Sequence, residues 1–250
     1  RHLSARLPGC MQAARGDLAS QEAACALVRR VRPDAGYHLA SRVDLSHAND
    51  VAEDCVRSNV LGTLHLLQAL AEHPPRVLVY ASTSDVYGDG PSPACEDQRE
   101  RPNTPYAAAK LAGEHLCRAY EVGHGVPVAV VRLSQVYGPG QRPERFVPSV
   151  CRALLRGEPL ALGCADAARD FVYVSDAVDG LLACAGAPGE TVNLGHEEAR
   201  TLGFVAGRLR EIVGGREGVL LWGERPDRLG EVRRRASSGL YANVCLGWRP

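Results

Sequence analysis

The chain lacks the sequence features of membrane and secreted proteins. None of the apolar runs in its 250 residues approaches the roughly 20 residues that a membrane-spanning helix requires. The opening segment, RHLSARLPGC, has no apolar centre of the kind found in a secretion signal. The nine cysteines are widely spaced and never form a Cys-x-x-Cys pair, which favours reduced thiols. We therefore predict a soluble, cytoplasmic protein with no membrane partner.

An excess of charge of either sign is also absent. Lys plus Arg and Asp plus Glu both number 29, so no global field attracts nucleic acid or an anionic membrane. A local basic cluster near the end of the chain comprises Arg225, Arg228, Arg233, Arg234 and Arg235. Because no aromatic residues are interleaved with these arginines, we predict no nucleic-acid partner and interpret Arg233 to Arg235 as a solvated face. His38 and His47 have no second ligand at a recognisable spacing, so no metal site is predicted.

The order of apolar and amphipathic segments predicts an α/β fold. Short apolar runs at 35–41, 76–83 and 126–138 alternate with helical patterns at 51–73 and from Pro105 onward. Strand, helix, strand, helix, strand in this order predicts a parallel sheet that is doubly wound, with helices on both faces.

A smaller and less regular lobe is predicted in the C-terminal part. After about Pro139, amphipathic helical patterns at 145–157 and 201–214 are separated by short strands and by turns rich in glycine and proline. We assign residues 1–139 to the main domain and 140–250 mainly to the lobe, with 170–195 returning to the main domain.

The segment from Thr104 to Lys110 places a phenol beside an ammonium. Thr104 can cap a helix, Pro105 suits its first turn, and Tyr106 and Lys110 then share one face. Free tyrosine titrates at about pH 10, but a fixed cation nearby favours phenolate and lowers the pKa toward the working range. Such a pair can accept a proton from a sugar hydroxyl while hydride leaves the carbon. Alone, Tyr-x-x-x-Lys is common by chance, and a surface tyrosine beside a solvated lysine is then the more frequent explanation.

The strand at 76–83 ends in hydroxyls and a carboxylate. Its last residues and those that follow read Ala81-Ser82-Thr83-Ser84-Asp85-Val86-Tyr87-Gly88. Ligands bind at the carboxyl ends of the strands in a parallel sheet, so Thr83, Ser84 and Asp85 become candidate site residues.

Together these segments resemble the extended short-chain dehydrogenase/reductase family, and within it the enzymes that epimerise, dehydrate or decarboxylate nucleotide-diphosphate sugars. The resemblance runs from about Arg15 to Pro250. It implies a Rossmann-like NAD(P)-binding domain at 1–139, a substrate-binding lobe and a homodimer. It also implies a UDP-, dTDP- or GDP-sugar as substrate, and NAD as cofactor because the hydride is returned internally.

The same resemblance implies a role for each matching residue. Thr83 would hydrogen-bond the sugar's 4-hydroxyl, Tyr106 would be the catalytic base, and Lys110 would hold the nicotinamide ribose while tuning Tyr106. Further cofactor contacts are implied for Asp17 and Leu18 in the adenine turn, for Leu39, Ala40 and Ser41 in the loop beside the cofactor, and for Asn59 near the nicotinamide half.

Substrate contacts are implied further along the chain. Gln135 stands where the family usually has an asparagine against the substrate, so its geometry departs from the family pattern. Arg169 and Arg228 resemble the arginines that grip the pyrophosphate, and Glu231 resembles the acid that binds the nucleotide ribose. Arginine suits this role because its planar fork engages phosphate oxygens bidentately.

The glycine-rich GxxGxxG turn of the family is missing, together with the strand and helix that carry it. We predict that the native protein has roughly thirty further N-terminal residues, the size of a strand-helix-strand unit, and continues past Pro250 into a terminal helix. A native mass near 26.8 kDa would contradict this prediction.

Ser84 and Asp85 bear on which reaction follows oxidation at C4. In the family, 4,6-dehydratases resemble Thr-Asp-Glu at this point, glucuronate decarboxylases and GDP-mannose dehydratases resemble Thr-Ser-Glu, and simple 4-epimerases usually carry no acid. Thr83-Ser84-Asp85 is closest to the second pattern, so we predict dehydration or decarboxylation, with Asp85 removing the C5 proton. The alternative reaction is 4-epimerisation, with an NADPH-consuming ketoreductase and a non-catalytic sugar-nucleotide-binding protein behind it. Asp85 could also merely cap the following turn.

Overall fold

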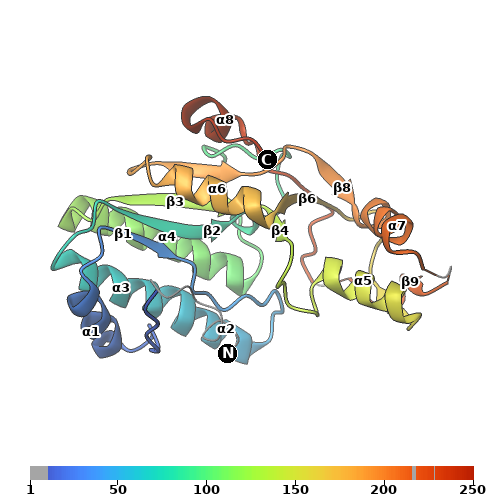
Figure 1. Cartoon of the computed structure of the whole chain (residues 1–250), viewed down its shortest axis with the longest axis horizontal. Helices are drawn as coiled ribbons and strands as arrows, with labels where there is room; N and C mark the ends of the chain where they lie inside the picture. The colour runs from blue at the N-terminus through green and yellow to red at the C-terminus, as the bar shows by residue number, and fades with distance from the viewer. Residues whose placement is uncertain (1–10, 216–217, 228) are drawn as a thin grey trace.

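The computed structural model describes residues 11–215, 218–227 and 229–250, and a four-stranded parallel sheet forms its centre. The strand order is β1-β2-β3-β7, and the strands are β1 (Ala35–His38), β2 (Val77–Thr83), β3 (Val128–Leu133) and β7 (Thr191–Leu194). Parallel neighbours need long crossovers, and helices supply them here (Figure 1). The predicted α/β fold is confirmed.

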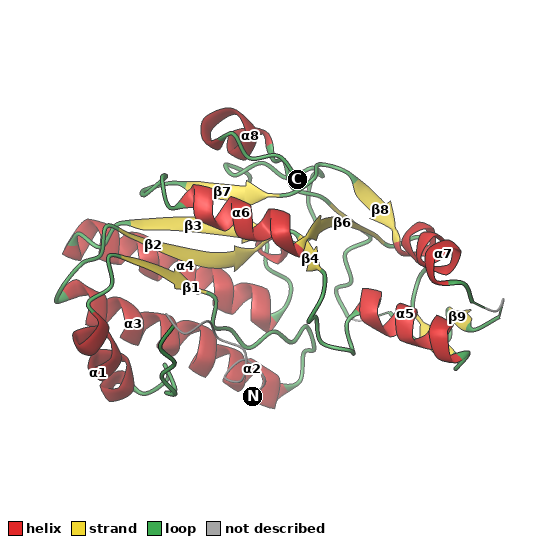
Figure 2. Ribbon diagram, viewed as in Figure 1, coloured by secondary structure: helices red, strands yellow, loops and turns green. Residues whose placement is uncertain are grey.

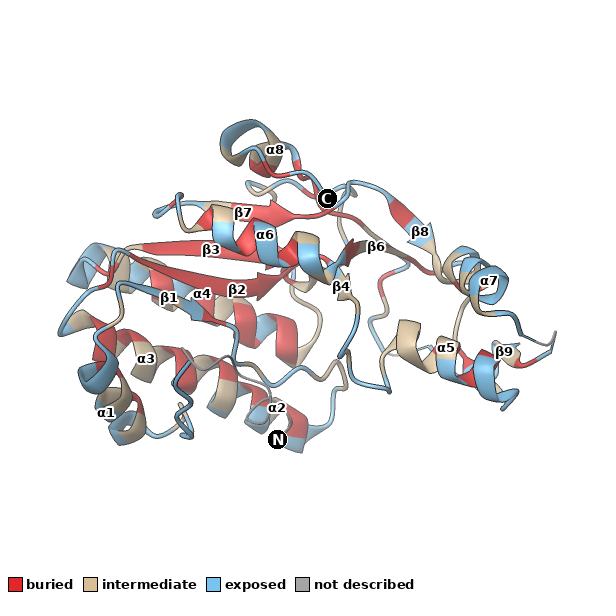
Figure 3. Ribbon diagram, in the orientation of Figure 1, coloured by how far each residue is buried: buried red, intermediate tan, exposed pale blue. Residues whose placement is uncertain are grey.

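Helices cover both faces of this sheet (Figure 2). One face carries α1 (Gln21–Val31), α3 (Gly62–Ala71) and α4 (Pro105–His124), and the other carries α6 (Val174–Cys184) and α8 (Leu240–Leu246). Successive strand residues point to opposite faces: Leu78 and Tyr80 pack with Leu67 of α3, whereas Val79 packs with Leu181 of α6. Every residue of β2 is buried, which explains its uninterrupted apolar run (Figure 3).

The carboxyl ends of the central strands meet at one edge of the sheet. In the register of the sheet, Thr83 at the end of β2 pairs with Leu133 of β3, and Leu133 pairs with Leu194 of β7. The residues that follow these three strands are therefore neighbours, although they are far apart in the sequence.

A second, small sheet begins where β3 was expected to continue. The apolar run at 126–138 was expected to be one strand, but it divides at Ser134 into β3 and β4 (Gln135–Tyr137), and β4 joins another sheet. That sheet also contains β6 (Ala168–Tyr173), β8 (Ala199–Thr201) and β10 (Arg234–Arg235). At the break, the Ser134 N–H donates to the Leu194 oxygen of β7 at 3.0 Å, while its hydroxyl donates to the Asp170 carboxylate of β6 at 3.1 Å.

The C-terminal lobe is built around two amphipathic helices, as their sequence pattern predicted. These are α5 (Phe146–Arg156) and α7 (Leu202–Val213), which pack with the short parallel strands β5 (Leu160–Leu162) and β9 (Leu220–Trp222). Val150 and Leu154 of α5 and Ala206 of α7 are buried in the centre of the lobe. In Figure 1 this lobe lies beyond the carboxyl edge of the main sheet.

Candidate active site

A cavity at the carboxyl edge of the main sheet contains the hydroxyls predicted from the end of β2. Thr83 ends the strand, and its Oγ1 accepts a hydrogen bond of 3.2 Å from the backbone N–H of Asp85, the second residue of the short 3-10 helix η2 (Ser84–Tyr87). The turn is thus capped by Thr83, and the Asp85 carboxylate is left for another partner. The cavity is lined by Thr83, Ser84, Asp85, Leu133, Ser134, Gln135, Arg169, Asp170 and Arg235.

Tyr106 reaches this edge from the first turn of α4. The helix begins as its sequence predicts, with the Thr104 Oγ1 accepting from the Ala107 N–H at 3.1 Å and with Pro105 in the first turn. Tyr106 is buried, and its side chain lies close enough to the Thr83 hydroxyl for that hydroxyl to lower the pKa of the phenol. The structure therefore brings together the phenol and the threonine hydroxyl that the sequence placed 23 positions apart.

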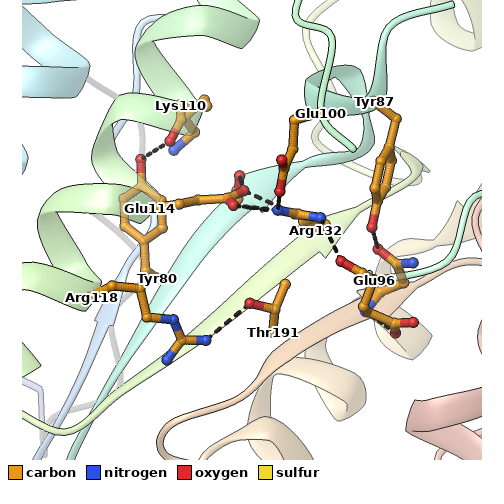
Figure 4. Close-up of polar contacts among 11 residues, drawn as sticks. Tyr80, Tyr87, Glu96, Glu100, Lys110, Glu114, Arg118, Arg132 and Thr191 are labelled. Atoms are coloured by element: carbon orange, nitrogen blue, oxygen red, sulfur yellow. Dashed lines mark hydrogen bonds and ion pairs between the residues drawn. The ribbon is translucent and has the colours of Figure 1, made fainter. Parts of the chain in front are cut away.

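Lys110 lies one turn further along α4 and is almost completely buried, at 2% exposure. Its ammonium lies 4.6 Å from the centroid of the Tyr80 ring. The Tyr80 hydroxyl in turn donates to the backbone oxygen of Lys110 at 3.3 Å (Figure 4). The ring can sit so close to the helix because Gly113 has no side chain, since a Cβ there would lie 2.1 Å from the Tyr80 hydroxyl. The Lys110 ammonium thus packs against the face of the Tyr80 ring. Its N–H groups can donate hydrogen bonds to hydroxyl oxygens such as those of a ribose.

The pKa values of the two groups correct one expectation. Burial raises the pKa of Tyr106 to about 12, and the Thr83 hydrogen bond and the charge of Arg145 offset only part of that rise. Burial likewise lowers the pKa of Lys110 to about 8. The expectation that Lys110 brings the Tyr106 pKa toward neutrality was therefore wrong for this arrangement, because desolvation penalises the charged form of each group.

Asn59 is buried in a local widening of the helix that follows α2 (Asn49–Cys55). Residues Val56–Leu61 form a π-helix, η1, and Asn59 lies within it. Its Oδ1 accepts from the Arg42 N–H at 2.7 Å and from the Ser41 hydroxyl at 3.1 Å, and its Nδ2 donates to the Arg42 oxygen at 3.0 Å. The amide thus fixes the loop that begins at Leu39 and Ala40, both exposed, so its influence on a cofactor would pass through that loop.

The predicted adenine turn lies beside the first turn of α3. The Asp17 carboxylate accepts from the Ala19 N–H at 3.0 Å and faces Arg57 at 3.5 Å. The Leu18 oxygen is 3.2 Å from the His65 Nδ1. These contacts attach the turn to the same helical segment that carries Asn59.

The residues expected to hold the nucleotide are only partly described. Arg169 lines the cavity and forms an ion pair with Glu231, so these two predicted residues are in contact with each other. Gln135 also lines the cavity and is exposed. Arg228, the other arginine expected at the pyrophosphate, lies outside the described residues.

Arg235 is a site residue that the sequence pattern did not indicate. It was expected on a solvated face with Arg233 and Arg234, but its guanidinium forms an ion pair with Asp85 inside the cavity, and its side chain is only 14% exposed. That expectation was wrong for Arg235 because β10 pairs in parallel with β6 and places Arg235 opposite Arg169. In the sequence, Arg235 differs from Arg233 and Arg234 in that an alanine, Ala236, follows it. The structure shows that Ala236 is buried.

Asp170 is a second residue that the site predictions omitted. It is 2% exposed and accepts hydrogen bonds from the Ser134 hydroxyl and from the backbone N–H groups of His196 and Ser237, at 2.9 to 3.1 Å. The segment after β7 can approach the Asp170 carboxylate because Gly195 has no side chain. A Cβ at Gly195 would lie 2.6 Å from that carboxylate. Burial raises the pKa of Asp170, while these hydrogen bonds act in the opposite direction. Asp170 lines the cavity and connects β6 by hydrogen bonds to the segments that contain Ser134, His196 and Ser237.

A buried polar network supports the same edge from the side of α4 (Figure 4). Arg132 of β3 is 3% exposed, and its guanidinium binds the Glu114 carboxylate of α4 at 2.7 Å, together with Glu100. The Ser82 hydroxyl, next to Thr83, also donates to Glu114. This network links the end of β2, β3 and the helix that carries Tyr106 and so holds their relative positions.

The comparisons with known proteins agree with this arrangement. A family model described as the NAD dependent epimerase/dehydratase family matches residues 2–195, and the chain belongs to this family. A dTDP-glucose 4,6-dehydratase of Escherichia coli (strain K12) is 32% identical over 267 residues, covering 94% of this chain and 73% of the relative. A UDP-glucose epimerase of Bacillus subtilis, itself uncharacterised, is 38% identical over 160 residues, which are 62% of this chain. The chain spans about half the length of that epimerase, 51%, and 67% of a Streptomyces griseus dTDP-glucose 4,6-dehydratase.

Among solved structures, the Thermus thermophilus UDP-glucose 4-epimerase in complex with NAD is similar along nearly the whole chain. It superposes with a TM-score of 0.91 at 29% identity, covering 98% of this chain and 81% of the epimerase. A Streptomyces venezuelae dTDP-glucose 4,6-dehydratase with NAD bound has a TM-score of 0.86 at 30% identity, with 94% and 73% covered. No helix within the described residues is both long and apolar enough to cross a membrane.

Proposed function

We propose that the protein uses NAD to oxidise C4 of the hexose in a nucleotide-diphosphate sugar, and that a dehydration or decarboxylation follows. The observation that carries this proposal is the proximity of the Tyr106 phenol to the Thr83 hydroxyl at the carboxyl edge of the sheet, with Lys110 one helical turn away. Two side chains that can share the proton of one sugar hydroxyl are in contact there. The relatives that bind NAD and act on nucleotide sugars support the same chemistry.

The composition of the chain adds independent support for Lys110. It is the only lysine in the sequence, and all the other basic residues counted with it are arginines. A small ammonium that can be buried and can donate to hydroxyls differs from a guanidinium, which is larger and always charged. A lysine kept at this one position is what a ribose-binding role would require.

Each residue has a definite task in the first step. Thr83 holds the 4-hydroxyl, and Tyr106 accepts its proton. Lys110 holds the ribose of the cofactor. A bound NAD would supply the acceptor for the hydride of C4 and the donor for its return to the sugar, so that no net nicotinamide would be consumed. Because burial keeps the Tyr106 phenol protonated at neutral pH, the hydrogen bond from Thr83 and the charge of Arg145 are the contributions of the chain that favour its role as base.

Asp85 is the residue of this chain suited to the second step. The ketone at C4 acidifies the C5 proton, and a carboxylate two residues after Thr83 can accept it. For dehydration, Asp85 would accept the C5 proton, and a C5=C6 double bond would form as the C6 hydroxyl leaves as water with the proton released from the 4-hydroxyl. The hydride would then be returned to C6, and the proton held by Asp85 would be returned to C5. The position of Asp85 in the cavity supports this role over turn capping, which Thr83 performs.

A 4-epimerase is the second candidate, supported by the UDP-glucose epimerases among the relatives and solved structures. It would need Thr83, Tyr106 and Lys110 but no acid at position 85. NADPH-dependent ketoreduction would use the same three residues while consuming cofactor. Homodimer formation and a cytoplasmic location stay predictions.

The test is to incubate the protein with NAD and a panel of UDP-, dTDP- and GDP-sugars, and to follow both reduced nicotinamide and product mass. The proposal predicts transient nicotinamide reduction and a product that has lost water or carbon dioxide. Products of unchanged mass with inverted C4 would favour the epimerase, and the absence of nicotinamide reduction with every sugar would contradict oxidation at C4.

A further inference from the structure

His38 is a buried histidine that the proposed chemistry does not use. It is the last residue of β1 and is 4% exposed. Residues 39–42, the loop expected beside the cofactor, follow it directly, and Leu39 and Ala40 are exposed. A polar ring is costly to bury unless its nitrogens find hydrogen-bond partners, so the partners of His38 show what the ring holds in place.

The Thr63 hydroxyl is the hydrogen-bond partner of the ring and fixes its tautomer. Thr63 is completely buried in α3, and its Oγ1 lies 3.0 Å from the His38 Nε2. The same hydroxyl donates its single proton to the Asn59 backbone oxygen at 2.6 Å. It can therefore only accept from His38, so Nε2 of the neutral ring carries the proton and Nδ1 does not. His38, Thr63 and Asn59 thus form a chain of hydrogen bonds with one direction.

This chain closes a ring of contacts around the 39–42 loop. The loop starts directly after His38, and its far end, at Ser41 and Arg42, is bound by the Asn59 side chain. Because Thr63 ties Asn59 back to His38, the two ends of the loop are fixed to each other as well as to the fold. The exposed stretch between these two anchors is therefore short and held on both sides.

The surroundings of His38 favour a neutral ring. Its centroid lies 5.6 Å from that of the Tyr80 ring, and the Lys110 ammonium lies over the same tyrosine ring. Burial lowers the pKa of His38 from 6.5 to about 3, and the charge of Lys110 acts in the same direction. A charged imidazole would carry a proton on both nitrogens and would repel the ammonium. A neutral histidine can therefore bind Thr63 close to Lys110, whereas an arginine in its place could not.

We infer that His38 is a positioning residue for the cofactor site: protonated at Nε2, it holds Thr63 and through it Asn59, and so fixes the 39–42 loop before the cofactor binds. The inference rests on the proposed function, in which NAD binds beside this loop. A loop that is already fixed loses little conformational freedom on binding, so the affinity for NAD is higher. His38 acts through its neighbours and not on the reacting atoms.

The tautomer is tested by NMR of the protein labelled with nitrogen-15 at histidine, with the His38→Gln variant identifying the signals of this ring. We expect Nε2 to be protonated and Nδ1 to be unprotonated, with chemical shifts that stay constant between about pH 8 and about pH 5. A ring protonated at Nδ1, or one that titrates near the ordinary 6.5, would overturn the inference. This measurement needs neither cofactor nor a destabilising variant.

Paired variants test the chain of bonds through hydrogen exchange of the Arg42 amide, which donates to the Asn59 side chain. Thr63→Val removes the hydroxyl, so this exchange should quicken about tenfold, and His38→Phe, which removes the anchor of that hydroxyl, should quicken it about fivefold. Thr63→Ser and His38→Gln keep the hydrogen-bonding groups and should stay within about twofold of wild type. Exchange of the Val79 amide in β2 should not change, which separates a local effect from a general loss of stability. Unaltered Arg42 exchange in both Thr63→Val and His38→Phe would contradict the inference.

Equilibrium binding of NAD connects the loop to the cofactor. We expect Thr63→Val and His38→Phe each to weaken NAD binding about five- to tenfold, and the double variant to weaken it no further, because both changes break the same chain. His73→Gln, a change at an exposed histidine shortly after α3, is the control and should leave the affinity unchanged. Wild-type affinity in both single variants would overturn the inference alone. Failure of the wild-type protein to bind NAD would overturn the proposed function and this inference with it.

Discussion

Arg132 and Arg235 are both buried arginines that bind a carboxylate, yet their surroundings differ. Arg132 binds Glu114, Glu100 and the backbone oxygen of Glu96, and its guanidinium lies 4.8 Å from the centroid of the Tyr87 ring. Arg235 lines the cavity and has Asp85 as its ion-pair partner, and its Nε has no hydrogen-bond partner among the described residues. A fully satisfied cation stabilises the fold, whereas a partly satisfied one in a cavity is available to a ligand. The contrast separates a structural pair from a functional one.

The largest effect on stability is expected from Arg132→Met. The change leaves the Glu114 carboxylate buried without its cation, so the free energy of unfolding should fall by about 3–5 kcal/mol in chemical denaturation. Arg208→Gln removes an exposed arginine paired with Glu211 and serves as the matched control, with no measurable change expected. A loss for Arg132→Met as small as that of the control would mean that the network does not hold the site.

Asp85→Asn should slow the reaction step that follows C4 oxidation, with little change in the free energy of unfolding. We expect product formation to fall about 100-fold while transient nicotinamide reduction persists, because C4 oxidation does not use Asp85. The control is Asp89→Asn, an exposed aspartate four residues further along the chain, which should retain full activity. Unchanged product formation in Asp85→Asn would reject its role in the second step and favour the epimerase.

Arg235→Met should lower the free energy of unfolding by only about 1 kcal/mol, since water can reach Asp85 through the cavity. Chemical denaturation of the single variant and of the double variant with Asp85→Asn would measure this loss. A loss equal to that of Arg132→Met would show that the two pairs are alike and would break the comparison.

The smallest expected effect concerns the pKa of Lys110 and its contribution to stability. Selective isotope labelling of lysine gives a single NMR signal from this sequence, and Lys110 should titrate with a pKa of about 8 against the ordinary 10.5. Because the unfolded chain then binds more protons at Lys110 between these two values, the contribution of Lys110 to stability should rise with pH across that window. The difference between the wild type and Lys110→Met measures this contribution separately from Cys117 and Cys184, whose raised pKa values act in the opposite direction. The raised pKa of Tyr106 acts in the opposite direction only above pH 10. A Lys110 pKa above 10 would contradict the burial described here.

Local patterns of sequence predicted the parts of the molecule that depend on near neighbours. Thr104 and Pro105 set the start of α4, and the apolar run of β2 set a buried strand that ends at Thr83. Both follow from capping and periodicity within a few residues.

The remaining features depend on partners far along the chain. At the break after β3, Ser134 binds Asp170, 36 residues later, and Arg235 binds Asp85, which lies 150 residues away in the sequence. The pKa of Tyr106 likewise depends on its depth in the fold. No local pattern encodes such distances.

Oxidation at C4 is tested most directly by the fate of an isotope. A hexose nucleotide carrying deuterium at C4, on whichever nucleotide binds, is incubated with the protein and NAD, and the product is examined by NMR. We predict that the deuterium appears at C6 of a product that has lost water, or is returned to C4 of a product that has lost carbon dioxide. Deuterium that stays at C4 of an unaltered sugar would contradict the assignment of Thr83, Tyr106 and Lys110 to this chemistry.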